Sequence, residues 1–185
     1  MQTDSLPRSE GPVQLAIRMR PPWRFIDEIR RFVESFCACA PGCPEHREAQ
    51  LAVAVHELVQ NAVPRAGQGD VELLLDVDPG IDRVLVEVTN PCTDAEYDEL
   101  RRRVERMNAQ PDALVHYVET MRSAPSHVRG GLGLARIRYE GQLEISLRRD
   151  AAKVTVVAQG KLKVPPPRPP EKNAGTTPEA KPCCK

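Results

Sequence analysis

Two short apolar runs separated by a turn constrain the fold of this chain more than any other feature. Residues 71–77 and 83–89 are rich in valine and leucine, and the five residues between them read Asp-Pro-Gly-Ile-Asp. Proline presets a turn, glycine tolerates positive φ, and aspartate bonds its own backbone, so this composition is typical of a tight turn. The pattern predicts a β-hairpin that forms the centre of a sheet.

Further strands are predicted on both sides of this hairpin. Residues 13–20 alternate apolar and polar side chains with period two, as a strand covered on one face does. Residues 142–148 and 153–158 form a second pair, with a turn near Arg149 and Asp150.

The segments between the strands have apolar residues every three or four positions, the spacing of helices with one buried face. Thr93 and Glu96 form a capping-box pattern at the start of one of them, and Pro41-Gly42 is a stop signal for another. The expected helices span residues 23–40, 45–63, 93–107 and 111–121, with a short one from about residue 132.

The 185-residue chain has room for one domain, which we place at residues 13–160. Residues 1–12 are expected to be a flexible N-terminus, and residues 161–185 a disordered, proline-rich tail. The 26 basic residues balance the 26 acidic ones, but the tail is basic, which leaves the body mildly acidic. That balance argues against nucleic-acid binding.

No stretch of the sequence resembles a membrane span or a secretory signal. The chain is therefore expected to be cytoplasmic, with no membrane partner.

Three of the six cysteines lie close together, and Cys37, Cys39, Cys43 and His46 could in principle be four zinc ligands. Their spacing is unlike the common zinc-finger patterns, and free thiols are the simplest interpretation.

An acid and an amide stand within the apolar run of residues 51–63. Glu57 and Asn61 are four residues apart, so a helix presents both on one face, where they suit a bound cation or an activated water. The alternative is that they occupy the solvated face of an amphipathic helix. His56-Glu57 resembles the start of a zinc-protease motif, but Gln60 replaces its second histidine, which excludes that site.

Glycines are dense just before the last predicted helix, where the sequence reads Gly130-Gly131-Leu132-Gly133-Leu134. Glycine lets the backbone approach a ligand closely, and a helix N-terminus offers free N–H groups to phosphate. The alternative is a tight turn without a ligand.

The order of elements, with Glu57-x-x-x-Asn61-Ala62 and Gly131-Leu132-Gly133-Leu134, resembles the ATPase domain of the GHKL group, and most closely the anti-sigma-factor serine kinases. The resemblance covers about residues 13–159. It implies an α+β fold of Bergerat type, a two-layer α/β sandwich whose mixed, mainly antiparallel sheet is covered on one face by helices. It also implies ATP and Mg²⁺ as cofactors and a lid at about residues 110–129.

The resemblance assigns roles to particular residues. Glu57 corresponds to a general base and Asn61 to the Mg²⁺ ligand, while Gly131, Gly133 and Leu134 correspond to the segment that cradles the phosphates. Where the family has an adenine-binding aspartate followed by two glycines, this chain has Asn90 and neither glycine, and Ala152-Lys153 stands near the family's Gly-Thr. A neutral amide is a weaker acceptor than a carboxylate.

Two functions follow from these matches and departures. The first is a signalling regulator that acts by partner switching and, if active, is an ATP-dependent serine/threonine kinase. The second is a docking module of the same fold that no longer depends on nucleotide. The candidate partners are an antagonist domain, a sigma factor or a second copy of the chain in a homodimer. A histidine-kinase catalytic domain detached from its phosphoacceptor is a weaker third alternative.

Overall fold

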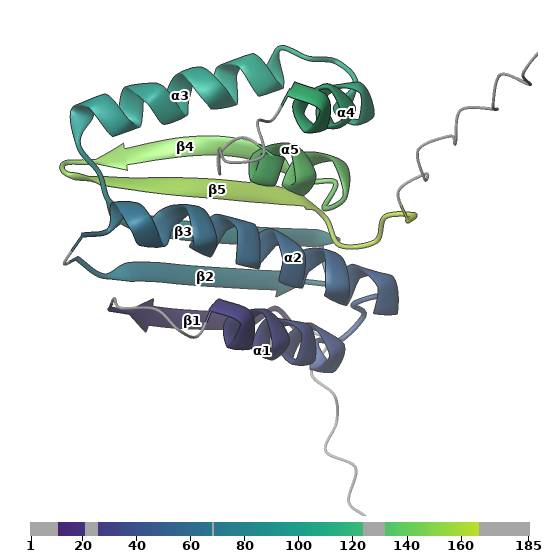
Figure 1. Ribbon diagram of the computed structural model, residues 1–185. Coiled ribbons are helices and arrows are strands. Elements are labelled where there is room, and N and C mark those ends of the chain that lie inside the picture. The colour runs from purple at the N-terminus through teal and green to yellow at the C-terminus, as the bar shows by residue number, and fades with distance from the viewer. Residues whose placement is uncertain (1–10, 21–25, 68, 124–131, 167–185) are drawn as a thin grey trace, which may run out of the picture.

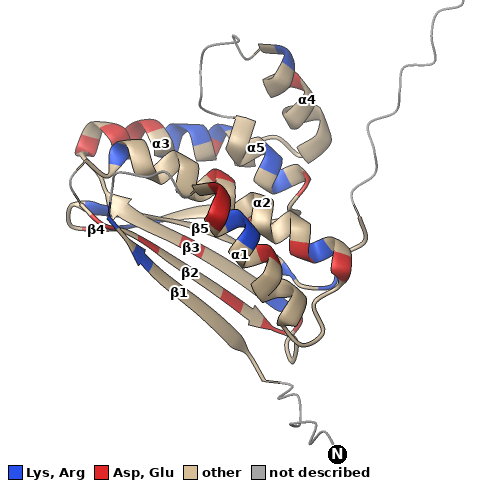
Figure 2. Cartoon of the chain, turned by 60° about the horizontal axis from the view of Figure 1, so that its bottom comes forward, with Lys and Arg blue, Asp and Glu red and all other residues tan. Residues whose placement is uncertain are grey.

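The computed structural model describes residues 11–20, 26–67, 69–123 and 132–166. They form a five-stranded sheet with helices packed against one face (Figures 1 and 2). The strands are β1 (Val13–Met19), β2 (Val71–Asp78), β3 (Arg83–Pro91), β4 (Glu144–Asp150) and β5 (Lys153–Lys161). The helices are α1 (Ile26–Cys39), α2 (Glu45–Ala62), the 3₁₀ turn η1 (Val63–Arg65), α3 (Asp94–Asn108), α4 (Ala113–Ser123) and α5 (Leu132–Tyr139).

The sheet has the order β1-β2-β3-β5-β4, and all four pairings are antiparallel. The predicted two-layer α/β sandwich is confirmed, and its sheet, expected to be mainly antiparallel, is wholly so in the described residues. The hairpin between β2 and β3 is also confirmed. There the Asp78 side chain accepts hydrogen bonds from the backbone N–H groups of Gly80 (3.0 Å) and Ile81 (3.3 Å).

The predicted helix signals are confirmed as well. The Thr93 hydroxyl accepts from the Glu96 backbone N–H, and the Glu96 carboxylate accepts from the Thr93 backbone N–H, which completes the capping box. Helix α1 ends at Cys39, and Gly42 adopts a φ of +69° in the turn that follows. None of the described helices is long and apolar enough to cross a membrane.

The core lies between the sheet and helix α2. Period-two alternation turns one face of each strand inward, and α2 lays its apolar stripe across that face. The fully buried residues of this layer include Leu51, Val55, Val59, Val71, Leu75, Val84 and Val86. Leu162, which follows β5, is also fully buried, so core packing extends beyond position 160.

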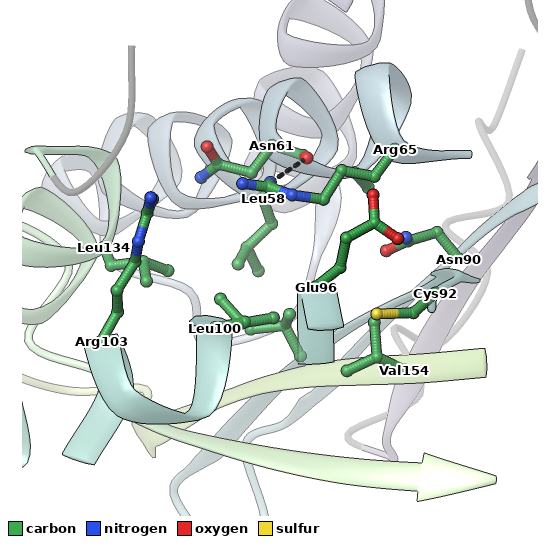
Figure 3. A pocket seen from close by; sticks show the side chains of 12 residues that line it. Leu58, Asn61, Arg65, Asn90, Cys92, Glu96, Leu100, Arg103, Leu134 and Val154 are labelled. Carbon is green, nitrogen blue, oxygen red and sulfur yellow. Dashed lines mark hydrogen bonds between the residues drawn. The ribbon is translucent and has the colours of Figure 1, made fainter. Parts of the chain in front are cut away.

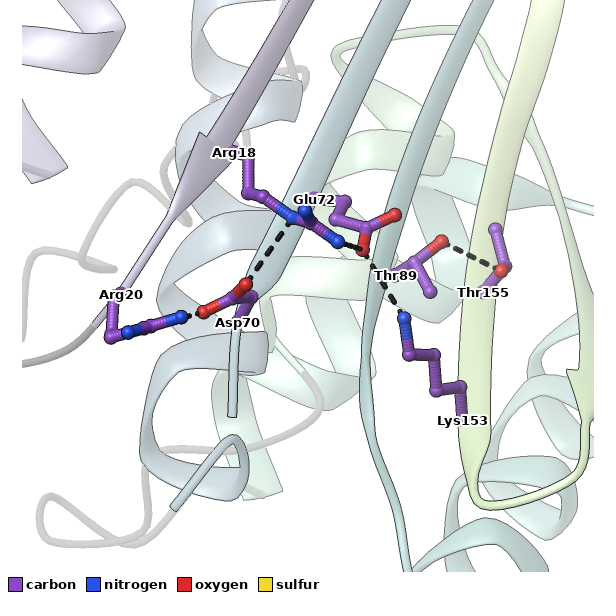
Figure 4. Close-up of polar contacts among 7 residues, drawn as sticks. All are labelled: Arg18, Arg20, Asp70, Glu72, Thr89, Lys153 and Thr155. Carbon is purple, nitrogen blue, oxygen red and sulfur yellow. Dashed lines mark hydrogen bonds and ion pairs between the residues drawn. The ribbon is translucent and has the colours of Figure 1, made fainter. Parts of the chain in front are cut away.

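The opposite face of the sheet carries a ladder of polar pairs across the strands (Figure 4). Arg18 on β1 and Lys153 on β5 both bind Glu72 on β2, at 3.0 and 3.2 Å. The hydrogen bonds from Lys153 and Arg18 lower the pKa of Glu72. Cross-strand pairs of opposite charge favour one register, so this ladder helps to align three of the five strands.

A charged side chain is buried where α2 begins. Arg47, in the first turn of α2, has no exposed surface. Its guanidinium donates to the backbone oxygens of Gly141 (2.5 Å) and Lys161 (2.9 Å) and to Gln50 Oε1 (2.9 Å). Arg47 therefore ties the start of α2 to the α5–β4 connection and to the end of β5.

Replacement of Arg47 by alanine should lower the free energy of unfolding by about 3 kcal/mol. The two carbonyls would lose their donor inside the core, and the space left by the side chain would add a cavity. Urea unfolding followed by circular dichroism measures the change. The matched control is Arg101→Ala on the outer surface of α3, expected to stay within about 0.5 kcal/mol of the wild type. Equal effects of the two substitutions would contradict the assigned role.

Candidate functional site

The acid and the amide of α2 lie together, as their spacing predicts. Glu57 and Asn61 are one helical turn apart and face helix α5. The Glu57 side chain is only 16% exposed, so it occupies a site between helices and not a solvated surface.

Gly133 allows α5 to approach this pair. A Cβ atom on Gly133 would lie 2.6 Å from Glu57 Oε2 and 3.3 Å from Asn61 Nδ2, closer than side chains pack. The structure therefore brings Glu57, Asn61 and Gly133 to one point, which we call the α2–α5 station. Gly131, the other predicted phosphate-binding glycine, lies outside the described residues.

An arginine that the motifs did not point to completes the station. Arg136, one turn beyond Gly133 on α5, binds Glu57 Oε1 at 3.2 Å and Glu140 Oε2 at 2.7 Å. Burial lowers the pKa of Arg136, but its hydrogen bonds to Glu140 and Glu57 outweigh burial and raise it above the ordinary value. The i,i+4 spacing of Arg136 and Glu140 is visible in the sequence. The contact of Arg136 with Glu57, 79 positions away, could not be read from the sequence.

The same network reaches helix α4. The Tyr117 hydroxyl donates to Glu140 Oε1 at 3.0 Å, and its ring stacks on Tyr139 with 5.2 Å between ring centroids. Burial, together with the bond to Glu140, raises the pKa of Tyr117. Helix α4 occupies residues 113–123 of the predicted lid, residues 110–112 precede it, and residues 124–129 lie outside the described residues.

A small cavity adjoins the station between α2, α3 and the sheet (Figure 3). Its volume is about 30 Å³, room for a few water molecules and far below the roughly 300–1,000 Å³ of pockets that hold small molecules. Its walls are Leu58, Asn61, Ala62, Arg65, Asn90, Cys92, Glu96, Leu100, Arg103, Leu134, Val154 and Val156.

This cavity is where the resemblance places adenine. Asn90 lies in its wall, only 4% exposed, and its amide nitrogen donates to the backbone oxygen of Pro91 at 2.7 Å. Directly across the strand pairing stands Val154, which also lines the cavity but offers no hydrogen bond. Lys153 is turned to the other face of the sheet, where it binds Glu72. Leu134, predicted to bind cofactor, contributes an apolar side chain to the wall.

Charged side chains surround the cavity mouth. Arg65 donates to the backbone oxygen of Asn61 at 2.7 Å, and Glu96 faces it from the start of α3 (Figure 3). Arg103, one helical turn beyond Leu100 on the wall-forming side of α3, also lines the cavity. No motif in the sequence points to Arg65 or Arg103, because their convergence depends on how η1 and α3 pack.

The four possible zinc ligands in the sequence, Cys37, Cys39, Cys43 and His46, are not grouped as a metal site. His46 Nε2 lies 2.7 Å from the backbone oxygen of Val164, and Cys39 is exposed. Within the described residues, no three histidine, cysteine or acidic side chains are grouped as a metal site would need.

Removal of the Arg136 side chain should leave the Glu57 carboxylate without its cationic partner. We expect Arg136→Ala to lower the free energy of unfolding by only about 1–2 kcal/mol, because Arg136 is partly exposed and solvent screens its ion pair. A double-mutant cycle with Glu57→Gln isolates the pair, with an expected coupling of about 1 kcal/mol by urea unfolding. A coupling below about 0.3 kcal/mol would show that the ion pair is not formed in solution.

No family model matches the chain, and no curated protein does. Among solved structures, the chain is similar to a chain in the crystal structure of the SiaB-SiaC complex from Pseudomonas aeruginosa, with a TM-score of 0.58 and 18% sequence identity. The match covers 78% of this chain and 88% of the other. At this identity the likeness shows a shared fold, and it extends over most of the sandwich described above.

Proposed function

We propose that this protein is a signalling regulator that acts on a protein partner and uses the α2–α5 station to bind the phosphates of Mg-ATP. The observation that carries the proposal is the packing of Gly133 against Glu57 and Asn61. An acid and an amide beneath a glycine at a helix N-terminus provide, at one point, the groups that bind a metal and phosphates. In this respect the chain resembles the anti-sigma-factor serine kinases.

The phosphate end of the site fits this cofactor. Asn61 would supply an amide oxygen to Mg²⁺, and the first turn of α5 would direct backbone N–H groups at the phosphates. When bound, the metal ion would neutralise phosphate charge. Glu57 would accept a proton from an attacking hydroxyl only after its bond to Arg136 opens. Arg136 would then be free to bind an anionic group.

The adenine end does not fit as well. The cavity of about 30 Å³ has no room for a purine ring, and Val154 stands opposite Asn90, where a polar side chain would help to hold the base. Nucleotide binding at this cavity therefore requires α3, which lines it, to move outward, and we expect weak affinity. A serine/threonine kinase activity would require part of the nucleotide-binding free energy to offset the cost of that movement.

The closed adenine end favours a second candidate, a docking module of the same fold that binds its partner without nucleotide. Both candidates share a protein partner, an antagonist domain or a sigma factor. The structural neighbour was solved in a complex of two proteins, SiaB and SiaC, which supports the proposal that this fold is used here for a protein–protein contact.

Titration calorimetry with Mg-ATP separates the candidates. The first predicts heat at about 1–5 mM nucleotide that disappears without Mg²⁺ and in Asn61→Ala. Gly133→Ala should also abolish the heat by displacing the tip of Glu57. The same substitution should change stability by less than about 1 kcal/mol, because alanine favours a helix over glycine.

The matched glycine control is Gly11→Ala, where a Cβ would meet nothing within 4 Å. This variant should bind as the wild type does. Absence of heat from wild-type protein would exclude the nucleotide-binding proposal and leave the docking module.

Partner capture tests the docking candidate separately. Tagged wild-type protein and the double variant Glu57→Ala/Asn61→Ala are compared for recovery of the same partner from extract of the native host. A nucleotide-independent module should retain the partner with unchanged yield, because both residues lie in an interhelical site. Loss of capture in a variant that keeps the wild-type circular dichroism spectrum would make a purely docking role untenable.

A further inference from the structure

Two thiols lie against each other at the corner between α1 and α2. Cys37, in the last turn of α1, is fully buried, whereas Cys43, in the connection to α2, is only partly buried. The side chains of Cys37 and Cys43 interact with each other, and the Cys43 sulfur also lies 3.9 Å from the backbone oxygen of Pro44. Cys39, two residues from Cys37, is exposed on another side of the helix.

The backbone of the corner holds this contact. The Ala40 N–H donates to the Cys37 carbonyl at 3.0 Å, and the Cys43 N–H donates to the Ala40 carbonyl at 3.3 Å. Gly42, at a φ of +69°, turns the chain back on the end of α1. A disulfide needs the two sulfurs to come within ~2.05 Å, and the glycine turn can absorb the movement that this requires.

The surroundings of Cys43 favour its thiolate. Arg47 is a buried cation whose hydrogen bonds to the described residues go to neutral acceptors, namely two backbone carbonyls and the Gln50 amide. Burial lowers the pKa of Arg47 to about 10, so it stays charged near neutral pH. The side-chain interaction with Cys37 lowers the pKa of Cys43, with a smaller contribution from Arg47, while burial and Glu48 act against it. The same interaction raises the pKa of Cys37, which keeps its proton.

We propose that Cys37 and Cys43 are an oxidisable dithiol pair, in which Cys43 is the reactive thiol and Cys37 the resolving one. The oxidant class is a hydroperoxide, small enough to reach the partly exposed sulfur of Cys43. The pair joins the end of α1 to the connection that leads into α2, the helix that carries Glu57 and Asn61. The proposal is independent of nucleotide binding.

The two steps balance as follows. The Cys43 thiolate attacks one peroxide oxygen, the O–O bond breaks, and the leaving alkoxide or hydroxide takes up a proton, which leaves a sulfenic acid on Cys43. The Cys37 sulfur then attacks the Cys43 sulfur and loses its proton, while the sulfenic hydroxyl departs as water. Two thiols and one hydroperoxide thus yield one disulfide, one water and one alcohol, or a second water when the oxidant is hydrogen peroxide.

Peptide mass spectrometry of the full chain tests the proposal. Trypsin releases residues 32–47 as one peptide that holds Cys37, Cys39 and Cys43, while Cys92, Cys183 and Cys184 fall in other peptides. After hydrogen peroxide treatment of dilute protein and alkylation, we expect this peptide to carry one alkyl group and to have lost ~2 Da from the bridge. Dithiothreitol should restore three alkylatable thiols.

The matched control is Cys39→Ser, which removes the exposed cysteine of the same peptide and should still show the ~2 Da loss. Cys43→Ser should abolish the loss, as should Cys37→Ala, with native folding checked by circular dichroism. Three alkylatable thiols after peroxide treatment of the wild type would overturn the proposal. So would a bridge that requires Cys39.

Discussion

The close approach of α5 to α2 is the contact on which the candidate site depends. A glycine at position 133 removes the side chain that would separate the two helices, and Glu57 and Asn61 occupy the space beneath it. A carboxylate with so little exposed surface needs a cationic partner, and Arg136, on the same helix as Gly133, binds Glu57. The packing of Gly133 against α2 and the ion pair between Arg136 and Glu57 therefore depend on one another.

Helix α2 is held at both ends by arginines with different partners. Near its start, the buried Arg47 binds backbone carbonyls of the α5–β4 connection and of β5. Near its end, Glu57 accepts the bond from Arg136. The first contact fixes the position of the helix on the sheet, and the second connects it through Glu140 and Tyr117 to helix α4. Side-chain contacts therefore connect α4 to the carboxylate of Glu57 along a path outside the core.

The two halves of the site have different character. The proposed phosphate end contains polar groups that a metal or an anion would use, whereas the proposed adenine end is closed by apolar side chains from α2, α3, α5 and β5. Binding of a whole nucleotide would have to displace those side chains, at a cost in buried apolar area. Whether the cavity beside Asn90 and Val154 can open for a base therefore distinguishes a nucleotide-dependent regulator from a docking module.

Local spacing in the sequence determined the elements and the neighbours within them. Period-two alternation identified the strands, the turn at residues 78–82 paired β2 with β3, and helical spacing placed Glu57 beside Asn61. Only the tertiary structure decided which side chains from distant elements meet. Val154 stands opposite Asn90 because of the β3–β5 register, and Arg136 binds Glu57 because α5 packs on α2. Such contacts depend on packing and register, which the spacing of residues along one element does not specify.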